Sequence, residues 1–202
     1  MTNTNNNHNK SWRTITLMFV MALLPIVLAI LFYFNPQWIK HYKNYGALIT
    51  PPIELQKTDL TALGAFSEQH FDELDERWLL IHVIPEHAID CDAVCRKSVF
   101  HSHQLWLMLN QNLMRLRRVM VFSDAETGSR IQSTINDPYL LYAVGRQSFL
   151  TKLAALHSAP IAAGTVVLRD PLGNVMLWYN PDFDPYKVKK DLSRLFRTSR
   201  VG

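Results

Sequence analysis

Two cysteines are the residues of this chain whose type and spacing point most directly to chemistry. Cys91 and Cys95 are the only cysteines among 202 residues, and they follow a short apolar run at residues 78–84. Two thiols four residues apart would lie one turn apart on one face of a helix. Held in that way, they could bind a soft metal ion such as Cu(I) or form a short-range disulfide.

The charges around this pair do not decide which chemistry it performs. A cysteine at the start of a helix has its thiolate form favoured by the unpaired backbone N–H groups. Asp90 and Asp92 oppose a thiolate, whereas Arg96 and Lys97 partly offset them. A metal site, a reversible disulfide and an inert buried pair therefore all remain open.

Histidines are the natural source of a third ligand for a thiolate-bound copper ion. His87 lies four residues before Cys91, and His157 lies far along the chain; both are candidate ligands. His101 and His103 are two residues apart on a predicted helix, so they cannot both face the cysteines. His82 lies inside the apolar run and is expected to be a core histidine with a hydrogen-bond partner.

An uncharged stretch near the N-terminus predicts a membrane anchor. Twenty residues without a charge, at about 1.5 Å per residue, are long enough to cross a hydrocarbon core of about 30 Å. No small-residue cleavage site follows them, so we expect an uncleaved, single-pass helix. The predicted organisation is a tail at residues 1–14, a transmembrane anchor at 15–34, a stiff spacer at 35–52 and a folded domain at 53–202.

Charge excludes one class of function and leaves the orientation of the anchor open. The formal net charge is only +4, which is too small to indicate nucleic-acid binding. Two basic residues lie on each side of the apolar stretch, so the charge rule gives no orientation. The cysteine pair favours an extracytoplasmic domain, because disulfides persist in oxidising compartments.

The pattern after the spacer predicts an α/β domain with a mixed sheet flanked by helices. Strand–helix–strand steps imply parallel pairing, and a late hairpin with an Asp-Pro-Leu-Gly turn adds antiparallel strands. A basic cluster at Arg115, Arg117 and Arg118 could meet an acidic partner, but we expect it to be a solvated helix end. The basic face of the last helix is likewise expected to be solvated, with contact to anionic lipid as the alternative; it consists of Lys187, Lys189, Lys190, Arg194 and Arg197. The expected elements are a strand at 78–84, a helix at 92–117, a strand at 119–122, a loop at 123–128, a helix at 139–156, a hairpin of 165–169 with 175–179, and a final helix capped by Asp184.

Cysteines at the first strand-to-helix turn of such a sheet are the thioredoxin arrangement, and the chain resembles the Sco/SenC family. The likeness is carried by Cys91-Asp92-Ala93-Val94-Cys95, by the segment Leu168-Arg169-Asp170-Pro171-Leu172-Gly173-Asn174 and by the uncleaved anchor. Members of that family are membrane-anchored, thioredoxin-fold proteins that assist copper loading of cytochrome c oxidase. The chain departs from them at Ala162, where copper-binding members have a histidine.

The resemblance implies an assembly factor for a respiratory oxidase, with Cys91 and Cys95 as copper ligands or as a redox pair. It further implies an inner-membrane location with a periplasmic domain, and an oxidase subunit or another copper or redox assembly protein as partner. Two alternatives stay open: a thiol-disulfide oxidoreductase, and a membrane-anchored interaction module that binds no metal.

Overall fold

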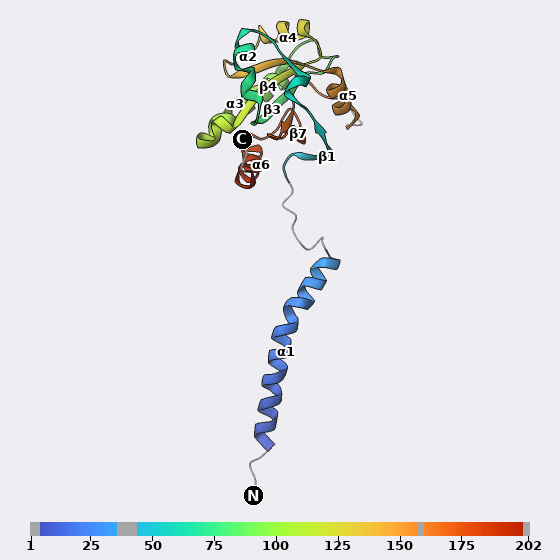
Figure 1. Ribbon diagram of the computed structural model, residues 1–202, viewed down its shortest axis with the longest axis vertical. Coiled ribbons are helices and arrows are strands. Elements are labelled where there is room, and N and C mark those ends of the chain that lie inside the picture. The colour runs from blue at the N-terminus through green and yellow to red at the C-terminus, as the bar shows by residue number, and fades with distance from the viewer. Residues whose placement is uncertain (1–4, 36–43, 157–159, 200–202) are drawn as a thin grey trace. The chain divides into compact units, whose positions relative to one another are not determined.

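The computed structural model describes residues 5–35, 44–156 and 160–199. Contacts divide the chain into two units, Met1–Lys43 and Asn44–Gly202. The described residues of the first unit contain one helix, α1 (Asn5–Phe34), drawn in blue in Figure 1. Its part from Trp12 to Phe34 is long and apolar enough to cross a membrane, so it fits a single transmembrane helix. The helix begins within the predicted tail, at Asn5.

The second unit is built on a seven-stranded mixed sheet with the order β1-β7-β6-β3-β4-β5-β2. The three strands β3, β4 and β5 are parallel, and every other pairing in the sheet is antiparallel. The strands are β1 (Ala47–Glu54), β2 (Leu60–Ala62), β3 (Trp78–Val83), β4 (Leu116–Phe122), β5 (Leu140–Gly145), β6 (Thr165–Arg169) and β7 (Asn174–Tyr179).

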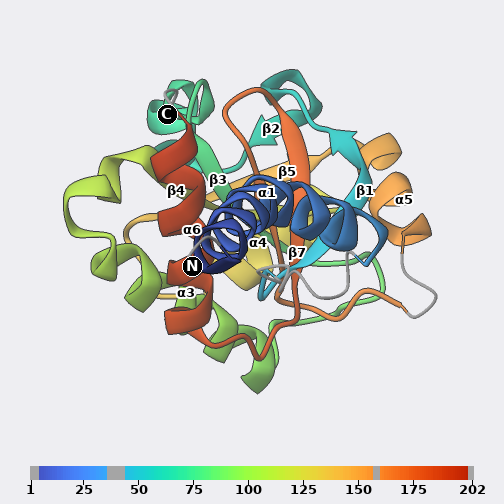
Figure 2. The same cartoon turned by 90° about the horizontal axis from the view of Figure 1, so that it is seen from below.

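Helices cover both faces of this sheet, as the sequence predicted. Leu80 of β3 packs with α3 and α6, whereas its neighbour Leu79 packs in a second cluster with α5, because successive strand residues point to opposite faces. Figure 2 shows α3 and α6 on one side of the sheet and α5 on the other. The helices are α2 (Ala65–His70), α3 (Ala93–Met108), α4 (Ala125–Gln132), α5 (Gln147–Ala155) and α6 (Pro185–Thr198), with short 3₁₀ turns η2 (Lys57–Asp59), η3 (Phe71–Leu74) and η4 (Asn110–Arg115).

The late hairpin and the last helix are confirmed. The backbone N–H of Gly173 donates to the carbonyl of Asp170 at 3.1 Å, which closes the predicted turn between β6 and β7. Asp184 caps α6, accepting a 2.9 Å hydrogen bond from the backbone N–H of Tyr186.

Three of the predicted segments are wrong in extent or in type. The helix expected over residues 92–117 ends at Met108, and β4 begins at Leu116 after a 3₁₀ turn. The helix expected over 139–156 is a strand, β5, followed by the shorter helix α5. The loop expected at 123–128 contains the start of α4, because Asp124 accepts a 2.8 Å hydrogen bond from the N–H of Thr127 and caps the helix.

The sheet also begins earlier in the chain than expected. Strand β1 starts at Ala47, inside the predicted spacer at residues 35–52, and pairs with β7. Pro51 and Pro52 lie within it and are exposed. Because β1 is an edge strand, a residue without an N–H is tolerated there.

Candidate disulfide site

Cys91 and Cys95 are joined by a disulfide, with their Cα atoms 5.2 Å apart. Cys95 lies in the first turn of α3, but Cys91 precedes the helix, whose N-cap is Asp92. The expectation that both lie on one helix face is therefore wrong. The backbone at Asp92 is extended, and α3 begins at the next residue. The two cysteines therefore meet at the N-terminus of α3, in the part of the chain that follows β3.

The acidic residues beside the cysteines are used to shape this turn. The carboxylate of Asp92 accepts a 2.8 Å hydrogen bond from the N–H of Cys95, and that of Asp90 accepts one of 2.7 Å from the N–H of Cys91. Arg96 donates a 2.6 Å hydrogen bond to the carbonyl of Cys91. The charges flanking the pair thus hold the backbone that carries the two sulfurs.

The disulfide is completely buried in an apolar environment. Neither Cys91 nor Cys95 has exposed surface. Both lie in a cluster with side chains from β4, β5, α3 and α4, among them Val99, Met120 and Ile131. A partner thiol can therefore reach a sulfur only if the structure around the pair opens.

A loop before β6 closes over Cys95. Gly164 has a φ of +80°, and a Cβ added to it would lie 2.7 Å from the Cα of Cys95, so this position requires glycine. Ala163 packs against the cysteine cluster, and Ala162 is exposed. Ala162, where the resemblance would place a histidine, thus lies in the loop that borders the disulfide.

The histidines suggested as metal ligands do not join the cysteines in the part of the chain that the structure describes. His87 is exposed and lines a separate cavity of about 290 Å³, and His157 lies outside the described residues. The ring of His101 is hydrogen bonded to the carbonyl of Phe183. Among the described residues, no group of three His, Cys, Asp or Glu side chains could hold a metal ion.

While the disulfide is formed, Cys91 and Cys95 cannot bind a copper ion. Cu(I) needs thiolates, and an imidazole is its usual additional ligand, but each sulfur here is bonded to the other. The loop beside the disulfide has an alanine, Ala162, at the position where the resemblance would place a histidine.

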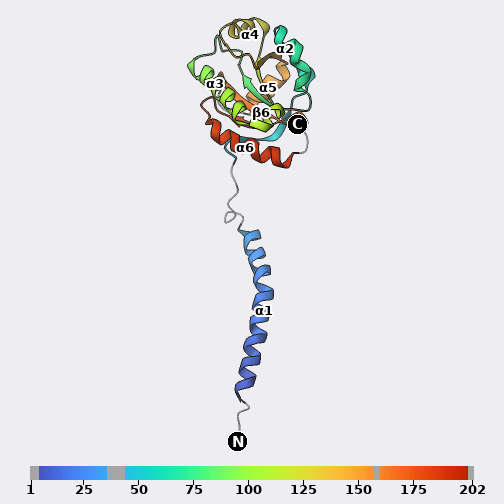
Figure 3. The ribbon, with the colours of Figure 1, turned by 90° about the vertical axis from the view of Figure 1, so that its left-hand side faces the viewer.

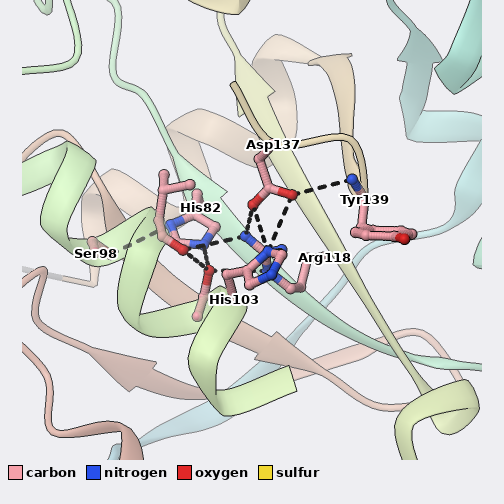
Figure 4. Close-up of polar contacts among 8 residues, drawn as sticks. His82, Ser98, His103, Arg118, Asp137 and Tyr139 are labelled. Atoms are coloured by element: carbon pink, nitrogen blue, oxygen red, sulfur yellow. Dashed lines mark hydrogen bonds and ion pairs between the residues drawn. The ribbon is translucent and has the colours of Figure 1, made fainter. Parts of the chain in front are cut away.

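A polar cluster that includes His82, His103, Arg118 and Asp137 was not found by sequence reasoning (Figure 4). The guanidinium of Arg118, on β4, donates a 2.6 Å hydrogen bond to the carboxylate of Asp137. The side chain of Arg118 is 1% exposed, so the prediction that it belongs to a solvated helix end is wrong. His103 contacts the same carboxylate at 3.2 Å.

His82 is the centre of this cluster and is a core histidine, as predicted. Its Nε2 lies 2.8 Å from Oγ of Ser102, and its Nδ1 lies 3.4 Å from Oγ of Ser98. Burial, together with the positive charge of Arg118, lowers the pKa of His82 to about 3. The imidazole is therefore neutral at physiological pH.

The cluster is connected to the loop over the disulfide by hydrogen bonds. Ser98 donates to the carbonyl of Gly164 at 2.7 Å, and Arg118 donates through Nε to Oγ of Ser102 at 3.0 Å. A continuous set of polar contacts thus runs from Gly164, beside Cys95, to Asp137. No sequence signal indicates it, because its members come from β3, α3, β4 and the segment after α4.

Comparison with known proteins defines the class to which this fold and site belong. Residues 78–199 match the family described as "Transmembrane-like, thioredoxin-like, C-terminal domain". The chain belongs to this family, and its mixed sheet flanked by helices is thioredoxin-like, as predicted. The comparison with curated proteins gives no match.

Sco1/SenC family structures are among the solved structures that match. The apo Sco1 protein from Thermus thermophilus is 18% identical, with a TM-score of 0.50 over 77% of this chain and 99% of that chain. Copper-bound ScoI from Arabidopsis thaliana is 12% identical, with a TM-score of 0.47 over 63% of this chain and 88% of that one. A SCO1/SenC family lipoprotein from Bacillus anthracis is 14% identical, with a TM-score of 0.45 over 73% and 99%. The predicted resemblance therefore holds as a likeness of fold in a divergent chain.

Proposed function

We propose that this protein is a membrane-anchored, thioredoxin-like assembly factor for a respiratory cytochrome c oxidase, and that Cys91 and Cys95 act as its redox pair. The observation that carries the proposal is a disulfide at the N-terminus of the helix that follows a central strand, in a thioredoxin-like domain. The Sco/SenC-like cysteine spacing supports the oxidase as the process served.

The redox step is a thiol–disulfide exchange with a dithiol protein. A thiolate of the partner attacks one sulfur of the Cys91–Cys95 bond, and the second partner thiolate then releases the mixed disulfide. The partner becomes a disulfide, and this chain gains two electrons and two protons as two thiols. The partner is an oxidase subunit or another copper or redox assembly protein.

The proposed location is the inner membrane, with the domain on its outer side. Helix α1 has the length and composition of a single span. A structural or redox disulfide persists on the oxidising side of such a membrane. Protease protection in right-side-out membrane vesicles tests this orientation, which is wrong if the domain is cleaved only after the vesicles are opened.

Copper delivery is a narrower form of the proposal. It assigns Cys91 and Cys95 as thiolate ligands after reduction, with His87 or His157 as a third ligand. Since the described residues do not bring such a set together, no step of the redox proposal depends on copper. Titration of the reduced full chain with Cu(I), against a Cys91→Ser/Cys95→Ser control, tests it; equal binding by the two proteins would remove copper from the proposal.

Complementation tests the proposal as a whole. In cells that lack this protein, we expect the intact chain to restore assembled, active oxidase and the Cys91→Ser/Cys95→Ser variant to fail. The variant must be present in the membrane at the level of the intact chain. Restoration by the variant would show that the cysteines are not used.

The burial of the disulfide favours a second candidate, a module that holds a membrane partner and uses the bond only for stability. Neither sulfur is accessible in the described fold. This candidate expects the bond to resist a dithiol reductant until the domain unfolds. The redox proposal expects reversible reduction of the folded full chain, followed by trapping of the released thiols with a maleimide.

A further inference from the structure

The outer face of α6 concentrates positive charge. Lys187, Lys190, Arg194 and Arg197 are spaced three, four and three residues apart, which places them on one side of the helix. Three of them, Lys187, Lys190 and Arg197, are exposed, and we call these three the α6 basic face. The opposite side of the helix packs on the sheet.

No exposed carboxylate of α6 offsets these charges. The only acidic residue of the helix, Asp191, is 3% exposed and faces inward. Its Oδ2 accepts hydrogen bonds of 2.9 Å and 3.1 Å from the backbone N–H groups of Tyr45 and Gly46. The positive charge of the α6 basic face is therefore exposed to solvent, and no acidic residue of the same helix neutralises it.

These same hydrogen bonds place the start of the domain on α6. Tyr45 is the second residue of the domain, and its hydroxyl accepts a further 3.0 Å hydrogen bond from the N–H of Asp184 at the cap of α6. Only eleven residue steps separate Phe34, the last residue of α1, from Tyr45. Fully extended, they span about 40 Å at most, and the chain that follows them enters the domain beside α6, the helix that carries the basic face.

Two exposed aromatic residues adjoin the basic face. Tyr45 is 41% exposed and Tyr186 is 67% exposed, and the ammonium of Lys187 lies 5.2 Å from the centre of the Tyr45 ring. Tyrosine and lysine together are the side chains that proteins place at the headgroup level of a bilayer.

We propose that the α6 basic face binds the anionic phospholipid headgroups of the membrane that holds α1. Docking would lay α6 along the bilayer surface and turn the opposite end of the domain, where α4 lies, away from it (Figures 1 and 3). Each Lys or Arg near an anionic surface increases binding about fivefold. Three such residues, close to a short tether, are enough to favour the docked orientation.

Energy transfer in reconstituted vesicles tests this proposal with the full chain. The native cysteines form a buried disulfide, so an introduced exposed cysteine, Ser193→Cys on α6, can carry a donor dye alone. The acceptor dye is placed on the lipid headgroups. We expect transfer to increase when phosphatidylglycerol is added to phosphatidylcholine and to fall again at high salt, which screens the charges.

A second label position distinguishes docking from general attraction. Ser129→Cys places the dye on α4, at the far end of the domain from α6 (Figure 3). We expect no increase in transfer from this position when phosphatidylglycerol is added. An equal increase in energy transfer from both positions, or no increase from position 193, would overturn the proposal. The α6 basic face would then be a candidate binding site for an acidic protein partner.

Charge variants complete the test. Lys187→Gln/Lys190→Gln/Arg197→Gln should reduce the docked-to-free ratio on the order of a hundredfold. A matched control removes the same net charge from exposed positions elsewhere, with Arg130→Gln/Arg146→Gln/Lys152→Gln, and should keep the response to phosphatidylglycerol. An equal loss in both triple variants would contradict the proposal, whatever the outcome for the redox pair.

Discussion

The guanidinium of Arg118 and the carboxylate of Asp137 form an ion pair with an N–O distance of 2.6 Å and almost no exposed surface. The two residues are nineteen positions apart and join β4 to the segment between α4 and β5. Burial opposes ionisation of Asp137, but the hydrogen bond and charge of Arg118 outweigh it, so the pKa of this carboxyl lies below its usual value. The pair is therefore charged in the folded protein at neutral pH.

Removing one partner of this pair is expected to be strongly destabilising. Asp137→Asn leaves the Arg118 charge buried without a counter-ion, which costs about 3–5 kcal/mol. Chemical denaturation of the full chain measures the loss. Asp182→Asn is the matched control, because its ion pair with Lys97 lies on the surface; comparable losses in both variants would contradict this account.

His82 is expected to make stability depend on pH. Its pKa is about 3 in the folded protein, against a usual value of 6.5. Between these values the unfolded chain takes up a proton that the folded chain does not, so the free energy of unfolding falls as the pH drops, by about 1.4 kcal/mol per pH unit. Above pH 6.5 this contribution is fully present.

The variant His82→Gln should flatten this part of the curve, because it keeps a polar contact toward Ser102 but does not titrate. The measurement is the free energy of unfolding of both proteins across the same pH range. The account fails if the two proteins show the same slope between pH 6.5 and 3, since carboxylates would then explain all of it.

Reduction of the disulfide should lower stability only moderately. The bond closes a loop with a sequence separation of four, and the chain-entropy model gives about 2 kcal/mol for so short a loop. The domain is then expected to stay folded as a dithiol. Denaturation with and without reductant measures this, and Cys91→Ala/Cys95→Ala should show no effect of reductant. Unfolding on reduction alone would favour the structural role of the bond.

The alanine in the loop beside Cys95 allows a gain-of-function test. Ala162→His would add an imidazole at the position given by the Sco/SenC resemblance, and Ala162 is exposed, so the side chain has room. We expect the reduced variant to bind Cu(I) at least about tenfold more tightly than the unmodified chain, because imidazole suits this ion. The same substitution combined with Cys91→Ala/Cys95→Ala is the control. Equal affinity of Ala162→His and the unmodified chain would show that the loop does not present position 162 to the sulfurs.

The parts of the fold that sequence predicted are those with strong local signals. The Asp-Pro-Leu-Gly turn fixes the β6–β7 hairpin, and the cap at Asp184 with its following apolar spacing fixes α6. The strand β5 was missed because residues 140–145 are almost wholly buried and so lack the alternation that marks a strand. A continuous apolar run before a true helix is easily read as one longer helix.

The site was predicted in part, for a different reason. The spacing of Cys91 and Cys95 indicated that they meet, and the structure joins them. The turn at Asp92 that separates Cys91 from α3 is a local N-cap, which the i,i+4 spacing of the cysteines did not reveal. The buried partner of Arg118, in contrast, depends on a contact between separate segments. The charge and the spacing of residues along the chain do not show which arginine is buried. Arg118 could therefore not be distinguished from an exposed arginine in the sequence.

The two prolines of β1 bear on how anchored copies of this domain behave beside one another. Membrane attachment confines the domains to a thin layer, where exposed sheet edges meet often. Pro51 and Pro52 lie exposed in the outermost strand, and neither has an N–H with which to extend the ladder onto a neighbouring molecule. This border of the sheet is thereby protected against intermolecular strand addition, which keeps crowded copies from polymerising edge to edge.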